Sequence, residues 1–155
     1  MADALTAQQT ADAVGVHMFA KDRASKAMGM RIVAMSEGAA FLEMTVRDDM
    51  LNGFDICHGG FITTLADSAF AFACNSTGDV TVAAGLTVDF LAPARAGDVL
   101  TARAFEVVHA GRSGVYDIAV TNQRGEQVAL VRGRAHRMKG QRVLPDGAAK
   151  GGAPR

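Results

Sequence analysis

The chain has 155 residues, 49% of them hydrophobic, and its 16 lysines and arginines balance 16 aspartates and glutamates. This size and composition suit one hydrophobic core, so we predict a single domain over residues 1–140. The balanced charge argues against a nucleic-acid partner. No apolar run approaches the roughly 20 residues that span a bilayer, so we expect no membrane partner either.

The two cysteines, Cys57 and Cys74, form neither a CxxC pair nor a zinc-ligand array. The first residues also lack the basic-then-apolar order of a signal peptide. We therefore expect a cytoplasmic protein that holds no metal and needs no cofactor.

The first half of the chain begins with an amphipathic helix, predicted over about residues 8–21 from apolar side chains at helical spacing. Thr6 is available as its N-cap. Two short strands are predicted next, over residues 31–36 and 40–46. Glu37-Gly38 between them indicates a tight hairpin turn.

A long apolar helix is predicted over about residues 59–75, after a loop that opens with the turn dipeptide Asn52-Gly53. Asp67 is the only charged side chain between Gly59 and Gly78. A carboxylate in so apolar a helix is costly unless something compensates it. We therefore expect Asp67 to have a function.

The second half of the chain alternates apolar and polar residues between turn signals, which is typical of strands. The four predicted strands span about residues 82–91, 99–109, 114–122 and 127–138. Residues 141–155 include a run rich in Gly, Ala and Pro and are predicted to be a disordered tail.

The order of these elements predicts the fold class. An unbroken apolar helix must be covered on most sides, and in so short a chain the strands must wrap it. We therefore predict an α+β hotdog fold, with a long central helix wrapped by a curved antiparallel sheet. The large side chains expected between helix and sheet are Phe61, Leu65, Phe70 and Phe72.

Gly59 and Gly60 lie where the long helix begins. The first backbone amides of a helix have no internal partner and carry the positive end of its dipole, and glycine lets a ligand approach them. An oxyanion that develops on a carbonyl would be stabilised there. His58 could orient the loop or contact that oxygen. The alternative is that the two glycines only permit a tight turn.

Asp67 lies seven residues beyond Gly60 on the same helix face, which is roughly 10 Å along the axis. One carbonyl cannot lie within about 3 Å of both groups in one chain. If both act on one atom, Asp67 comes from a second copy, with the two helices antiparallel across a twofold axis. Asp67 would then be a general base toward water or a nucleophile. The alternative is a buried ion pair with Arg103 or Arg132.

Several short motifs between residues 12 and 138 together resemble a known family. They are Asn52-Gly53, Cys57 to Gly60, Leu65 to Asp67, Ala73 to Ser76, Asp89 to Leu91, Gly97-Asp98, Gly114 to Asp117 and Arg132 to Arg137. With these the chain resembles the hotdog thioesterases of bacterial phenylacetate degradation. The resemblance implies hydrolysis of acyl-CoA substrates, phenylacetyl-CoA and hydroxyphenylacetyl-CoA among them. It also implies a homotetramer built from two dimers, with the active sites at the dimer interface.

The resemblance also implies roles for single residues. The Gly59 amide would polarise the thioester carbonyl, and Asn52 would assist at the site. Asp67 of the neighbouring subunit would attack the carbonyl or activate water, while His58 would hold the loop. One position departs from the pattern, because Ala83-Ala84 stands where some relatives carry a serine that orients the water.

The phosphorylated nucleotide end of CoA needs cations and free amides. The turn at residues 111–114, which contains Arg112 and Ser113, together with Arg134 and Arg137, offers such groups. A solvated hairpin tip is the alternative for each of them.

At the acyl end, Gly60, Thr64 and Ser68 are expected to contact the substrate, the two hydroxyls through a polar ring substituent. These hydroxyls could instead bond to backbone carbonyls four residues earlier. The side chains expected to wall an aromatic acyl pocket are Met18, Phe19, Leu51 and Phe54.

Other functions compete with the thioesterase hypothesis. A hotdog hydratase or dehydratase would use His58 and Asp67 for proton transfer on the acyl chain. A non-catalytic acyl-CoA binding module would need no buried Asp67. A Cys57 nucleophile or a zinc site formed by Asp55, Cys57 and His58 is disfavoured, because these neighbours in sequence seldom converge on one point.

Overall fold

The computed structural model describes residues 4–145. Its helices are α1 (Ala7–Lys21), α2 (Arg23–Ala27), the short 3-10 helix η1 (Asp48–Met50) and α3 (Gly59–Asn75). Its strands are β1 (Arg31–Ser36), β2 (Ala39–Thr45), β3 (Asp79–Phe90), β4 (Val99–Ala110), β5 (Ser113–Thr121) and β6 (Gln127–Arg142).

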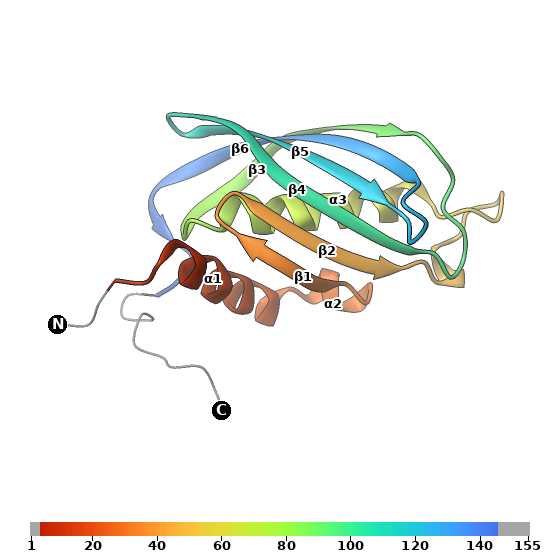
Figure 1. Cartoon of the computed structure of the whole chain (residues 1–155), viewed down its shortest axis with the longest axis horizontal. Helices are drawn as coiled ribbons and strands as arrows, with labels where there is room; N and C mark the ends of the chain where they lie inside the picture. Colours follow the sequence, from red (N-terminus) through yellow and green to blue (C-terminus); the bar gives the residue numbers. More distant parts are fainter. Residues whose placement is uncertain (1–3, 146–155) are drawn as a thin grey trace.

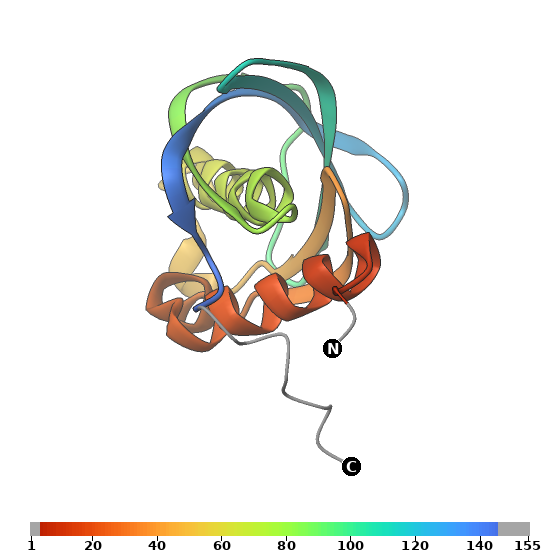
Figure 2. The same cartoon turned by 90° about the vertical axis from the view of Figure 1, so that its left-hand side faces the viewer.

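All six strands form one antiparallel sheet in the order β1-β2-β4-β5-β6-β3, so β1 and β3 are its edges. The sheet extends along the length of α3 (Figure 1), and the end-on view shows it curving around that helix, with α1 and α2 beneath (Figure 2). The predicted α+β hotdog fold is therefore confirmed.

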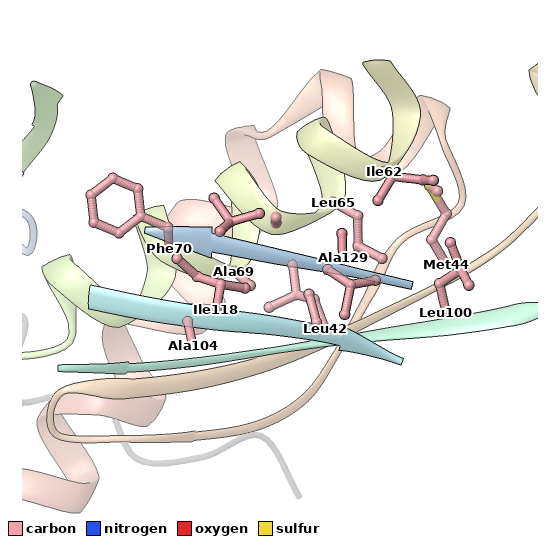
Figure 3. Close-up of a cluster of buried hydrophobic side chains, with 14 of the residues drawn as sticks. Leu42, Met44, Ile62, Leu65, Ala69, Phe70, Leu100, Ala104, Ile118 and Ala129 are labelled. Carbon is pink, nitrogen blue, oxygen red and sulfur yellow. The ribbon is translucent and has the colours of Figure 1, made fainter. Parts of the chain in front are cut away.

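The core lies between α3 and the inner face of the sheet. Side chains of the helix such as Leu65 lie in one buried cluster with strand residues such as Leu42 (Figure 3), and the ring of Phe70 lies 5.4 Å from that of Tyr116 in β5. Phe72 differs from the prediction, because its ring lies 6.3 Å from that of Phe19 in α1 and so packs on the first helix. The apolar surface of α3 is thus covered by α1 as well as by the sheet.

Local signals explain the first helix and also the one that the sequence analysis missed. Thr6 forms a complete capping box with Gln9 at the start of α1. Asp22 then caps α2, accepting a hydrogen bond from the Ser25 amide at 2.9 Å. This N-cap is the sequence signal for α2, but five residues are too few for a recognisable period.

Two further expectations concern the C-terminal tail and the absence of a membrane-spanning helix. Strand β6 continues to Arg142, beyond the predicted end at residue 138, and residues 146–155 of the predicted tail lie outside the described residues. None of the helices within residues 4–145 is both long and apolar enough to cross a membrane.

The contact between Gly133 and Phe70 gives a stability prediction. A Cβ added at Gly133 would lie 2.9 Å from three ring atoms of Phe70, and this ring is fully buried. Because the ring has no room to move, Gly133→Ala should lower the free energy of unfolding by about 1 to 3 kcal/mol. Urea denaturation at one protein concentration measures this change.

The matched control is Gly53→Ala, since a Cβ added there meets nothing within 4 Å. The double variant Gly133→Ala with Phe70→Leu should lose less stability than the two single losses added together. Strict additivity would show that the two residues do not compete for the same space.

Candidate active site

The loop before α3 is held by its own polar groups. Leu51 and Cys57 form an isolated bridge that closes it. The side-chain oxygen of Asn52 accepts from the amides of Phe54 at 2.9 Å and Ile56 at 3.5 Å. Such turns around an asparagine oxygen replace regular backbone pairing. The loop therefore fixes Asn52 beside the start of α3, with its side-chain carbonyl already engaged.

His58 is the N-cap of α3, and its ring decides which amide stays free. Nδ1 of His58 accepts a hydrogen bond from the Gly60 amide at 2.9 Å. This bond engages one of the two glycine amides expected to meet an oxyanion. The Gly59 amide has no acceptor among residues 4–145, as expected for the first amide of a helix.

A pocket of about 520 Å³ lies beside the Gly59 amide. Its lining residues are Asn52, Ile56, Cys57, Gly59, Ile62, Phe90, Leu91, Ala92 and Pro93. Volumes of this size are typical of small-molecule sites. The unpaired amide and the apolar pocket thus lie together, at the positive end of the α3 dipole.

The side chains predicted to wall an acyl pocket do not line this one. Phe54 is 85% exposed, while Met18 and Phe19 pack against the core from α1. Phe90 and Ile62 line the pocket instead of the predicted side chains. Phe90 was missed because its approach to Gly59 depends on tertiary packing, although it belongs to a recognised motif. Ile62 lies one turn beyond Gly59 on α3, so helical spacing could have indicated it.

Asp67 lies on the partly exposed stripe of α3, and no residue within 4–145 forms a hydrogen bond or ion pair with it. Burial raises the pKa of its carboxyl. The two arginines proposed as partners are engaged elsewhere. Arg132 donates two hydrogen bonds of 2.7 Å to Asp117, and Arg103 donates to the Thr121 hydroxyl at 3.0 Å. The alternative of a buried ion pair between Asp67 and Arg103 or Arg132 is therefore wrong.

The two helix hydroxyls expected at the substrate have partners within the chain. Thr64 donates to the Gly60 carbonyl at 2.7 Å, the bond to a carbonyl four residues earlier that was the alternative. Ser68 lies 3.0 Å from the Ser25 hydroxyl of α2. The Thr64 hydroxyl proton is thus engaged within the chain, and its oxygen can act toward a ring substituent only as an acceptor.

The expected nucleotide-binding residues lie away from Gly59. Arg112 and Ser113 are exposed at the turn between β4 and β5, and the Arg134 guanidinium lies over Gly85 of β3. Register pairs Phe90 with Ala129 but Gly85 with Arg134. Arg137 instead forms an ion pair with Asp79 at 3.4 Å. Arg112 and Ser113 thus lie toward the opposite end of the sheet from the pocket, and Arg134 lies beside the middle of β3.

Two competing chemistries find little support in the geometry. Burial raises the pKa of the Cys57 thiol to about 11, so the thiolate that a nucleophile requires is disfavoured. Across residues 4–145, no three His, Cys, Asp or Glu side chains cluster closely enough to hold a metal ion.

Comparisons with known proteins show which family the chain resembles. The family model of the thioesterase superfamily matches residues 54–129. The acyl-coenzyme A thioesterase PaaI of Escherichia coli (strain K12) is 52% identical over 124 residues, which cover 79% of this chain and 88% of that protein.

Two solved structures extend the likeness to the fold. That of E. coli PaaI, from the phenylacetic acid degradation operon, has a TM-score of 0.86 at 46% identity and covers 88% of this chain and 99% of its own. A Streptococcus mutans UA159 protein bound to acetyl-CoA has a TM-score of 0.68 at 28% identity, with coverages of 70% and 88%. By its sequence and its fold, this chain belongs to the thioesterase superfamily.

Proposed function

We propose that this chain hydrolyses acyl-CoA thioesters, with phenylacetyl-CoA and hydroxyphenylacetyl-CoA as its substrates. The observation that carries the proposal is the unpaired Gly59 amide beside an apolar pocket of about 520 Å³. The relatives named above support the substrate class, since one is an acyl-CoA thioesterase and another binds acetyl-CoA.

The Gly59 amide is the proposed donor to the thioester oxygen. When the carbonyl carbon is attacked, negative charge develops on this oxygen. An oriented N–H at a helix N-terminus stabilises it without reorganisation. His58 acts as a positioning residue, because its bond to Gly60 leaves the neighbouring amide as the open one. Asn52 lines the same pocket and is the proposed second contact.

Asp67 of the partner subunit is the proposed base or nucleophile. As a base, its carboxylate takes a proton from water while the water oxygen bonds to the carbonyl carbon, and the tetrahedral intermediate then expels CoA as the thiolate. As a nucleophile, it attacks the carbonyl carbon and displaces CoA as the thiolate, and water then opens the resulting anhydride to the free acid and the Asp67 carboxylate. Burial raises the pKa of this carboxyl, which moves it toward the range useful to a base.

The edge strand β3 supports a dimer in which these groups meet. It runs for 12 residues with its outer side unpaired by the described chain, and Val82 and Leu91 beside that edge are exposed. Exposed apolar edge strands tend to pair with another chain. A twofold axis there would set the two α3 helices antiparallel. Asp67 of the partner subunit would then approach Gly59.

The same axis would bring the nucleotide-binding groups closer to the pocket. Within one chain, Phe90 and Val82 are eight strand positions apart, and Val82 pairs with His136, which pairs with Ser113. Eight strand positions correspond to roughly 26 Å, which is the separation along the strand between the pocket and the turn that contains Ser113. Reversal of the partner moves its Arg112 and Ser113 toward the Gly59 end. One CoA would thus contact both subunits.

Assembly and location complete the proposal. Two such dimers would form the tetramer that the family resemblance implies, and exposed apolar residues on β4 and β6, Val108 and Leu130, are compatible with a further contact. Both cysteines are free thiols, which accords with the reducing cytoplasm.

Thiol release from phenylacetyl-, hydroxyphenylacetyl-, benzoyl- and hexanoyl-CoA tests the reaction. Wild-type chain should release CoA from the phenylacetyl esters, and Asp67→Asn should lower kcat about 100- to 10,000-fold, the range for a missing general base. The matched control is Asp12→Asn, an exposed position on α1 that should leave the rate unchanged. Absence of thiol release from every ester by wild type would contradict the proposal and favour a hydratase or a non-catalytic binder.

Asp67 should also affect stability in a pH-dependent way. Because burial raises its pKa, the folded chain binds this proton more tightly than the unfolded chain. The free energy of unfolding therefore falls as the pH rises from the ordinary aspartate pKa to the raised one, and it stays lower above that window. Asn cannot ionise, so the stability of Asp67→Asn relative to wild type should increase across this range.

Urea denaturation from about pH 3 to about pH 8 measures this difference. A variant that loses stability relative to wild type as the pH rises would show that the ionised carboxylate has a stabilising partner. Such a result would favour a structural role for Asp67.

A further inference from the structure

The ring of Phe90 packs directly against the α-carbon of Gly59, and a Cβ added at residue 59 would meet this ring first. Such a Cβ would stand 2.7 Å from Cζ of the Phe90 ring and 3.1 and 3.2 Å from its two Cε atoms. The far edge of the ring therefore points at the α-carbon that follows His58. Glycine at position 59 permits this approach, and the ring lies beside the amide proposed to bind the thioester oxygen.

The ring is also available to a ligand. Phe90 ends the edge strand β3 and is 55% exposed in the described chain, although aromatic side chains of soluble proteins are mostly covered. The other apolar side chains around the pocket are aliphatic, among them Ile56, Ile62 and Leu91. Among the described residues that line the pocket, Phe90 is the one aromatic residue.

We propose that Phe90 determines the preference of the enzyme for aryl over aliphatic acyl groups. This inference rests on the proposed thioesterase function. With the carbonyl oxygen at the Gly59 amide, a phenylacetyl ring is separated from the carbonyl carbon by a single methylene, so it must lie in the same pocket as Phe90. Two rings in offset or edge-to-face contact attract each other beyond the burial of their surface. A flexible aliphatic chain gains no such contact.

Phe90→Leu tests the inference, because it retains an apolar side chain and removes the ring. The measured quantity is kcat/KM for phenylacetyl-CoA divided by kcat/KM for hexanoyl-CoA. This ratio should fall roughly three- to tenfold, the range that one aromatic pair contributes. Phe90→Tyr retains the ring and should preserve the wild-type ratio. If Phe90→Leu fails to fold, the same ratio is measured for Phe90→Met.

The matched control is Phe105→Leu. Phe105 is a phenylalanine of similar exposure, 49%, which lies on β4 against Phe41 and does not line the Gly59 pocket. Its substitution should leave the ratio unchanged. The ratio isolates the aryl contact, because a purely structural effect on Gly59 would lower both rates together.

The outcomes separate this inference from the function on which it rests. A wild-type chain that releases no thiol from any ester overturns both. A wild-type chain that hydrolyses both esters, with the ratio unchanged in Phe90→Leu, overturns the role of Phe90 alone. An equal loss for both esters likewise assigns Phe90 to structural support of the loop.

Discussion

Helix α3 has an apolar surface on almost every side, and the need to bury it shapes the whole fold. The sheet covers the face that contains Leu65 and Phe70, and α1 covers Phe72 through Phe19. A helix of this kind is stable in water only when other elements surround it. One stripe stays partly exposed, and the single carboxylate, Asp67, lies on it. The burial of α3 thus also determines where its charge can meet a substrate.

Periodicity predicted most of the fold. The long apolar run of α3 and the alternation along the strands were sufficient to predict a helix wrapped by an antiparallel sheet. Strand order was not predicted, because it depends on long-range pairing that no local pattern records. The prediction that Phe72 packs against the sheet was wrong for a related reason. The sequence of a helix that is apolar on nearly every side does not indicate which face contacts which element. Helix α2 was too short to show a period.

The candidate site was predicted in outline and refined in detail by side-chain geometry. Two adjacent glycines at a helix start indicate an anion site, but the sequence cannot say which amide is free. That depends on the His58 ring, whose Nδ1 accepts from Gly60. The contact between Gly59 and Phe90 joins segments far apart in the chain, so spacing could not reveal it. Ser68 likewise forms a hydrogen bond with the Ser25 hydroxyl of α2, a helix that had not been predicted.

The central claim is that one active site takes Gly59 from one chain and Asp67 from another, and subunit mixing tests it directly. Asp67→Asn and Gly59→Pro, which lacks the amide proton, are each expected to be inactive. Equal co-expression of the two inactive chains should restore about a quarter of wild-type activity, because each shared site needs two intact halves. A mixture no more active than either variant alone would contradict the shared site.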